Sequence, residues 1–82
     1  MEFGRSAFKH GFSQGEILHA IDTAVVVVDL DPDSDPPKVL AIGVDPSGRW
    51  LEVVWLQFAD RDVVIHAMRL RKRFMDLVEQ GD

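Results

Sequence analysis

The feature that most constrains the fold is a series of four short segments, from residue 24 onward, that are rich in valine, isoleucine and aromatic residues. Proline, glycine and aspartate interrupt the series at residues 31–37 and 45–48, and residues 59–62 form a third short connection. Short connections join antiparallel neighbours, so the sequence predicts a four-stranded antiparallel β-meander. The expected strands are Ala24–Asp29, Lys38–Val44, Trp50–Phe58 and Val63–Met68.

Helical patterns flank these strands on both sides. Arg5–His10 is expected to form a short helical turn that Gly11 ends. A second helix should begin at Ser13, because Ser13 and Glu16 have the spacing of a capping box. After the strands, apolar residues recur at helical spacing and predict a C-terminal helix that packs on the sheet; they are Leu70, Phe74, Leu77 and Val78. The predicted fold is α+β, with two short N-terminal helices, four antiparallel strands and a C-terminal helix.

Length and composition indicate one small domain. A chain of 82 residues with 46% hydrophobic content suffices for one core, so residues 1–82 are expected to form a single domain. Such a core has a small stability margin, which favours a partner or self-association. The absence of cysteine excludes disulfides and thiolate metal sites. Neither a signal-peptide pattern nor an apolar run of membrane-spanning length occurs, so we expect a cytoplasmic protein.

Charges of opposite sign are segregated along the chain, although the net charge is −5. The loop from Leu30 to Pro37 is acidic, whereas the segment around residue 70 is basic. Alternating aspartates resemble calcium ligands, but the glycine and glutamate of a calcium-binding loop are missing, so a solvated hairpin loop is expected instead. The acidic residues are Asp29, Asp31, Asp33 and Asp35, and the basic ones are Arg69, Arg71, Lys72 and Arg73.

Several kinds of chemistry are disfavoured by the residue types present. The serines occur in cap or turn contexts, and no lysine follows the glycines of residues 43–48 as it would in a phosphate-binding loop. His19 points away from the apolar face of its helix and is expected to be a solvated surface residue. Three aromatic residues of the third segment are expected in the core, since aromatic residues in central strands are usually buried; they are Trp50, Trp55 and Phe58.

The segment Ile65–Arg71, where the last strand leads into a basic helix, is the predicted functional surface. Strand alternation places Val64, His66 and Met68 on one face, and leaves open whether His66 is buried or presented. Cations at the positive end of a helix dipole are unfavourable, which indicates an anionic partner.

These residue types fit metal-independent cleavage of a phosphodiester. Histidines exchange protons near neutral pH, and arginine holds phosphate oxygens. His10 and His66 are the predicted proton-transfer groups, and Arg71 is predicted to stabilise the charged phosphorane. No cofactor is expected, and the predicted RNA-binding cations are Lys9, Arg69, Lys72 and Arg73.

Three stretches resemble the BrnT toxins, ribonucleases of bacterial type II toxin–antitoxin modules with a fold related to RelE. They are Lys9–Ser13 with Glu16–Ile17, Ile42–Gly43 followed by Gly48–Val54, and Val64–Ala67 leading into a basic helix. The resemblance implies messenger RNA cleavage, growth arrest and neutralisation by a cognate antitoxin, often of ribbon-helix-helix type. It leaves open assembly into a homo-oligomer or a toxin–antitoxin hetero-oligomer.

The chain departs from the BrnT pattern in its last strand. His66 replaces the usual serine, and Met68 occupies the position of the usual arginine. Two hypotheses therefore follow: a toxin-like endoribonuclease held inactive by an antitoxin, or a non-catalytic protein-interaction domain of the same fold. The acidic balance favours the second, whereas the paired histidines and arginines favour the first.

Overall fold

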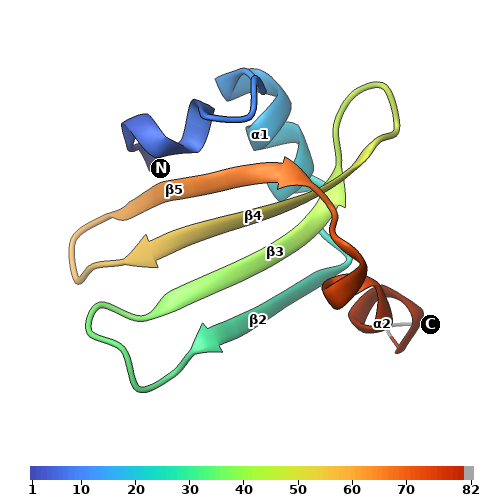
Figure 1. The fold of residues 1–82 in the computed structure, drawn as a ribbon. Coiled ribbons are helices and arrows are strands. Elements are labelled where there is room, and N and C mark those ends of the chain that lie inside the picture. The colour runs from blue at the N-terminus through green and yellow to red at the C-terminus, as the bar shows by residue number, and fades with distance from the viewer. Residues whose placement is uncertain (81–82) are drawn as a thin grey trace.

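The structure, a computed structural model, describes residues 1–80 and is shown in Figure 1. Within these residues, no helix has the length and apolar character needed to cross a membrane. The elements in chain order are β1 (Glu2–Phe3), the 3₁₀ helix η1 (Arg5–Phe8), α1 (Gln14–Asp22), β2 (Val26–Asp31), β3 (Lys38–Val44), β4 (Trp50–Gln57), β5 (Asp62–Arg69) and α2 (Lys72–Gln80).

The strands form a five-stranded mixed sheet with the order β1-β5-β4-β3-β2. Strands β2 to β5 are antiparallel neighbours, joined by short connections. The additional strand β1 pairs in parallel with β5, with Glu2 opposite Val63 and Phe3 opposite Val64. The predicted four-stranded antiparallel architecture is therefore wrong. A two-residue strand has too little sequence pattern to be recognised, and its pairing depends on a contact with residues 61 positions further along the chain.

The N-terminal helices also differ from the prediction. Residues Arg5–Phe8 form a single 3₁₀ turn, so the structure has one α-helix before β2 instead of two. Gly11, with φ of +87°, turns the chain after it. The capping box at Ser13 is confirmed: the Glu16 main-chain N–H donates to Ser13 Oγ at 3.2 Å, and the Ser13 N–H donates to Glu16 Oε1 at 2.8 Å.

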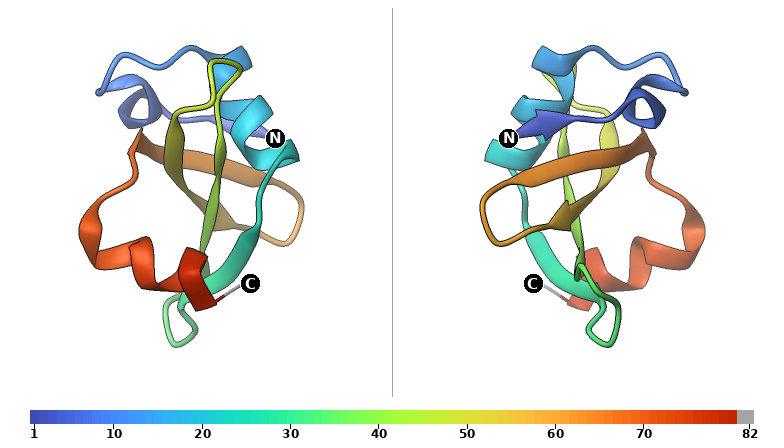
Figure 2. Two further views of the ribbon diagram at one scale, coloured as in Figure 1. Left: turned by 90° about the vertical axis from the view of Figure 1, so that its right-hand side faces the viewer. Right: turned by 90° about the vertical axis from the view of Figure 1, so that its left-hand side faces the viewer.

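Helices α1 and α2 lie on opposite faces of the sheet (Figure 2), so each face has its own apolar cluster. On the α1 face, Ile17 and Ala20 pack with buried residues of the sheet. Gly43 of β3 permits a close approach, because a Cβ atom there would lie 1.9 Å from the main-chain oxygen of Ala20. On the opposite face, residues of α2 pack against the buried side chains of Leu40, Ile42 and Val54; they are Phe74, Leu77 and Val78.

The three aromatic residues expected in the core have different environments. Trp55 is 8% exposed and belongs to the cluster on the α1 face. Phe58 is half-buried and follows β4. Trp50, at the start of β4, is 38% exposed, so its placement in the core was wrong.

Candidate active site

A buried carboxylate occupies the third position of β4, a strand in which most residues are apolar. Glu52 is fully buried between Leu51 and Val53, two equally buried hydrophobic residues. An ionised carboxylate is costly to bury without partners, so its contacts indicate which groups the fold brings together. These contacts come from β5 and from the connection between β5 and α2.

A β-bulge in β5 aims His66 at Glu52. Val54 pairs with His66 and Trp55 pairs with Val64, so Ile65 is an extra residue that breaks the strand alternation. Ile65 packs in the cluster on the α2 face, whereas Val64 belongs to the cluster on the α1 face. The prediction that Val64 and His66 share a face is therefore wrong. His66 faces the α2 side of the sheet, where its Nε2 lies 2.9 Å from Glu52 Oε1.

Arg71 binds the same carboxylate in three ways. Its main-chain N–H donates to Glu52 Oε2 at 3.0 Å, and its side-chain Nε donates to Oε1 at 2.8 Å. Nη2 lies 2.6 Å from the same Oε1. Arg71 immediately precedes α2, and its side chain is 42% exposed, so the guanidinium is held at its inner edge and open to solvent at its outer edge.

The protonation states follow from these contacts. Burial alone would raise the pKa of Glu52, but hydrogen bonds from Arg71 and His66, together with the charge of Arg71, outweigh it and lower the pKa. Glu52 is therefore ionised at neutral pH and can only accept hydrogen bonds. His66 Nε2 must carry a hydrogen, which leaves Nδ1 of the neutral ring as the atom that can accept a proton.

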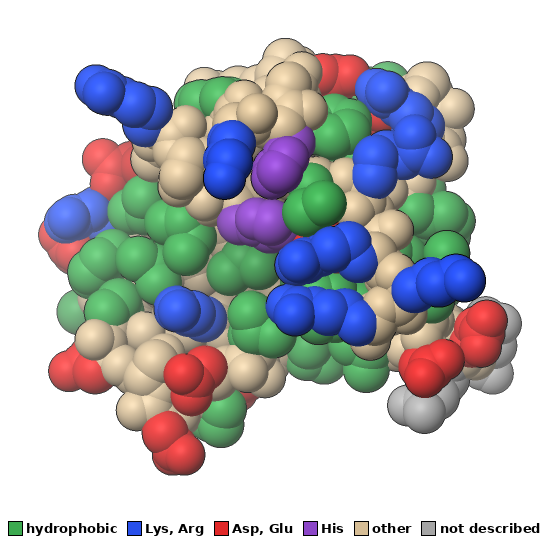
Figure 3. Space-filling view, in the orientation of Figure 1, with side chains coloured by type: hydrophobic (Ala, Val, Ile, Leu, Met, Phe, Trp, Pro, Cys, Tyr) green, Lys and Arg blue, Asp and Glu red, His purple; other side chains and the backbone are tan. Residues whose placement is uncertain are grey.

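His10 comes to this site from the other end of the chain. It lies in the connection between η1 and α1, and its exposed ring contacts the His66 ring edge-on, with 5.9 Å between centroids and an interplanar angle of 79°. The Ser6 hydroxyl donates to the Ile65 carbonyl at 2.5 Å, which holds η1 against β5 at the bulge. Figure 3 shows histidine side chains in contact on this face, bordered by Lys and Arg side chains.

The structure thus places His10, His66 and Arg71 together: Glu52 binds His66 and Arg71, and His10 contacts His66. We call these four residues the Glu52 site. The cations expected to bind RNA are exposed and form no ion pair with any described residue. Lys9 is next to His10, and Lys72 and Arg73 are in the first turn of α2. Arg69, at the end of β5, pairs with Leu51 of the α1-face cluster, so it lies on the opposite face of the sheet from Glu52.

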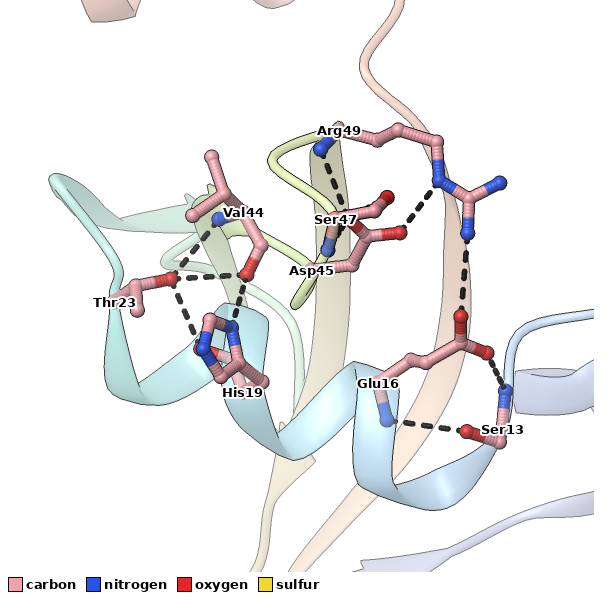
Figure 4. Close-up of polar contacts among 8 residues, drawn as sticks. All are labelled: Ser13, Glu16, His19, Thr23, Val44, Asp45, Ser47 and Arg49. Atoms are coloured by element: carbon pink, nitrogen blue, oxygen red, sulfur yellow. Dashed lines mark hydrogen bonds and ion pairs between the residues drawn. The ribbon is translucent and has the colours of Figure 1, made fainter.

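A second polar cluster joins the β3–β4 turn to the start of α1 (Figure 4). Arg49 binds Asp45 at 2.6 Å and Glu16 at 3.2 Å. Burial would raise the pKa of Asp45, but hydrogen bonds from Arg49 and Ser47 and the charge of Arg49 lower it to about 2. This cluster holds the turn against α1, and both of its carboxylates are paired with Arg49.

His19 is half-buried rather than solvated, so the expectation for it was wrong. Its Nδ1 lies 2.8 Å from the carbonyl oxygen of Val44 and donates to it, since a carbonyl oxygen can only accept. The Thr23 hydroxyl also contacts this oxygen, at 3.1 Å, as Figure 4 shows. Helix periodicity placed His19 off the apolar face but could not show that the end of β3 lies beside it.

Glu52 is the candidate site residue that sequence reasoning missed. The signal was present, since one acidic residue interrupts the apolar run of β4 at a position with hydrophobic neighbours on both sides. A strand in the centre of a sheet covered on both faces buries such a residue whichever way it points. No group of three or more His, Asp or Glu side chains among the described residues is arranged to hold a metal ion.

The comparisons with known proteins locate the family of the chain. A family model described as "Domain of unknown function (DUF4258)" matches residues 3–69, which run from the last residue of β1 to the end of β5 and include Glu52 and His66. No curated protein matches the chain, and neither does any solved structure.

Proposed function

Because the chain belongs to the DUF4258 family, whose function is unknown, the Glu52 site is the best guide to its activity, and we propose that the protein is an endoribonuclease working by general acid–base catalysis. The observation that carries the proposal is the contact of two histidines beside an arginine, with one of the histidines oriented by a buried carboxylate. RNA offers its own nucleophile, the 2′-hydroxyl, so a site of this kind needs only proton-transfer groups and a cation.

In the proposed reaction, His66 Nδ1 removes the proton of a 2′-hydroxyl while Glu52 stabilises the imidazolium that forms. The 2′-oxygen attacks the adjacent phosphorus, and the 5′-oxygen of the next nucleotide leaves with a proton from His10. The products are a 2′,3′-cyclic phosphate and a 5′-hydroxyl. The outer edge of the Arg71 guanidinium, which Glu52 leaves open, stabilises the charge of the phosphorane.

The surrounding cations support RNA as the substrate. Lys9 is next to His10 in the chain, Lys72 and Arg73 follow Arg71, and none of these three has a carboxylate partner among residues 1–80. Figure 3 shows Lys and Arg side chains beside the histidines, on the surface of a chain whose net charge is −5. This distribution favours contact with phosphates near the site and weakens long-range attraction of nucleic acid, so binding should be short-ranged and sensitive to salt.

The activity is tested by incubating the purified protein with RNA in excess chelator and analysing the ends of the products. We expect cleavage with 2′,3′-cyclic phosphate ends, and loss of cleavage in both His10→Ala and His66→Ala. Arg71→Lys should also lose activity, whereas Arg61→Lys should retain it, because Arg61 pairs with Glu2 and Asp60 away from the site. Undiminished cleavage by either histidine variant would refute the mechanism.

We further propose that this ribonuclease acts as the toxin of a type II toxin–antitoxin module. The support is the resemblance to BrnT toxins, including the Lys9–His10 entry to the capped helix, and the position of His10 at the Glu52 site. The partner would be a cognate antitoxin, of ribbon-helix-helix type if the resemblance extends to it. Inducible expression in a bacterial host should arrest growth and fragment RNA, and co-expression of the neighbouring open reading frame should relieve the arrest. Unaltered growth with intact RNA would contradict the proposal.

A protein-interaction domain is the second candidate, and the edge strand β2 is the observation that favours it. Val25 and Val27 are 59% and 58% exposed beside the edge of the sheet that no other described strand covers. Exposed edges of this kind pair readily with other chains. This candidate predicts that Val27→Lys abolishes binding of a partner protein and that His66→Ala does not. The ribonuclease proposal predicts that His66→Ala abolishes RNA cleavage and that Val27→Lys does not.

A further inference from the structure

Trp50 is exposed at the surface although tryptophan is normally largely buried. It is the first residue of β4 and pairs with Val44 of β3. On its other side, its carbonyl oxygen accepts the N–H of Leu70 at 2.9 Å. The backbone around Trp50 is therefore fixed from both sides, while 38% of the residue remains open to solvent.

The position of Trp50 relates it directly to the Glu52 site. Side chains two residues apart on a strand share a face and lie roughly 7 Å apart, so the indole is on the Glu52 side of the sheet. Leu70 binds the Trp50 carbonyl, and the next residue, Arg71, binds the Glu52 carboxylate. On this face of β4, Glu52 lies between Trp50 and Val54. Val54 is opposite His66 in β5.

The groups near Trp50 suit one kind of ligand. Arg71 follows Leu70, the residue that binds the Trp50 carbonyl, and its side chain is bound to Glu52 on the same face as Trp50 and is 42% exposed. Cations that follow a phosphate backbone, next to an exposed aromatic ring, are the combination by which proteins bind single-stranded nucleic acid. A base can stack on the indole only if it is unstacked from its neighbours, which a duplex does not permit.

We propose that Trp50 is a base-stacking subsite and that the substrate class is single-stranded RNA, with the base of a nucleotide flanking the scissile phosphate placed on the indole. The inference rests on the proposed ribonuclease function for the identity of the scissile bond. The stacking itself can be measured without any cleavage.

The two tryptophans of the chain make the test direct, because Trp55 is buried in the cluster on the opposite face. In Trp55→Phe the tryptophan fluorescence comes from Trp50 alone, and in Trp50→Phe it comes from Trp55 alone. The probe is a short single-stranded oligonucleotide with 2′-O-methyl groups, which removes the nucleophile. We expect it to quench the fluorescence of Trp55→Phe and to leave that of Trp50→Phe unchanged. A hairpin duplex of the same composition should quench neither.

Affinity is measured by the fluorescence anisotropy of a labelled oligonucleotide at fixed salt. Trp50→Ala should weaken binding roughly 5- to 150-fold, the range for one aromatic–base stack, and Trp50→Phe should recover part of the loss. Leu18→Ala, which alters another exposed hydrophobic residue, should have no effect. Circular dichroism of each variant shows whether it is folded, and Trp50→Phe tests the subsite if Trp50→Ala does not fold.

The outcomes separate this proposal from the ribonuclease proposal. Equal affinity of Trp50→Ala and wild type, or equal affinity for the duplex and the single strand, would overturn the stacking subsite. Weakened binding by Trp50→Ala, in a protein that cleaves no RNA, would support the subsite and overturn the ribonuclease. Cleavage of RNA by the wild type, with unchanged affinity in Trp50→Ala, would support the ribonuclease and overturn the stacking subsite.

Discussion

Replacing Glu52 with glutamine tests whether the buried carboxylate organises the site. Glutamine has nearly the same shape but one acceptor oxygen and one donor nitrogen. If its oxygen takes the place of Oε1, its NH₂ group meets the Arg71 main-chain N–H; in the opposite orientation, the NH₂ group meets His66 and the Arg71 side chain. Either way, at least one donor loses its acceptor and the remaining hydrogen bonds lose the charge of the carboxylate.

The expected cost can be worked from these contacts. A hydrogen bond to a charged group contributes roughly 1.5–3 kcal/mol, and two or more are lost or weakened. The Arg71 side chain is 42% exposed, so water replaces part of its interaction. We therefore expect Glu52→Gln to lower the free energy of unfolding by about 2–4 kcal/mol, out of roughly 4–12 kcal/mol for a chain of this length. RNA cleavage should fall as well, because His66 loses its orienting partner.

The pH dependence gives this prediction its sharpest form. The pKa of Glu52 is below its ordinary value of 4.5 in the folded protein. Ionised Glu52 therefore stabilises the fold at pH values above 4.5, and this stabilisation is lost as the pH falls through the lower, folded-state pKa. Urea unfolding followed by fluorescence should show the full difference between wild type and Glu52→Gln at neutral pH, and a smaller difference in acid. The exposed Glu79→Gln is the matched control. A Glu52→Gln protein as stable as wild type at neutral pH would refute the reasoning.

Three further predictions concern the fold. Gly43→Ala should lower the free energy of unfolding by roughly 2–3 kcal/mol in chemical denaturation, because its Cβ would overlap the main-chain oxygen of Ala20; an unchanged midpoint would contradict this close approach. Asp45→Asn should lower the melting temperature at neutral pH through the lost pairing with Arg49, and the difference should disappear as the pH approaches 2, the folded-state pKa of Asp45. Ser13→Ala should cost about 1 kcal/mol through the lost cap of α1, measured by urea unfolding, and equal stability would show that the cap is dispensable.

Local signals in the sequence were sufficient for several elements. The capping box at Ser13 and Glu16 begins α1, because its two hydrogen bonds link residues only three positions apart. The turn at Asp45–Gly48 and the short connection before β5 separate segments of strong β-propensity, and β4 and β5 lie within a residue or two of the expected positions. Such features are encoded by neighbouring residues, so the sequence alone can reveal them.

Features that depend on distant contacts could not be read in this way. The pairing of β1 with β5 brings together residues about 60 positions apart and changes the sheet from antiparallel to mixed. The bulge at Ile65 shifts the register by one residue, which reverses the face of His66 relative to simple alternation. Composition identified His10, His66 and Arg71 as candidates, but only the bulge and the buried carboxylate of Glu52 explain how the last two meet.

If Glu52 contributed only to stability, an apolar residue at this position would serve as well or better. Buried ion pairs are often matched or surpassed in stability by apolar side chains, and every other described residue between Leu51 and Trp55 of β4 is a buried hydrophobic residue. The carboxylate does what a leucine cannot: it fixes the tautomer of His66 and holds one edge of Arg71 while leaving the other edge open. Glu52→Leu separates the two roles, because it removes the buried charge together with its desolvation cost. If that variant unfolds at a higher urea concentration than Glu52→Gln yet cleaves no RNA, the carboxylate serves to position the catalytic groups rather than to stabilise the fold.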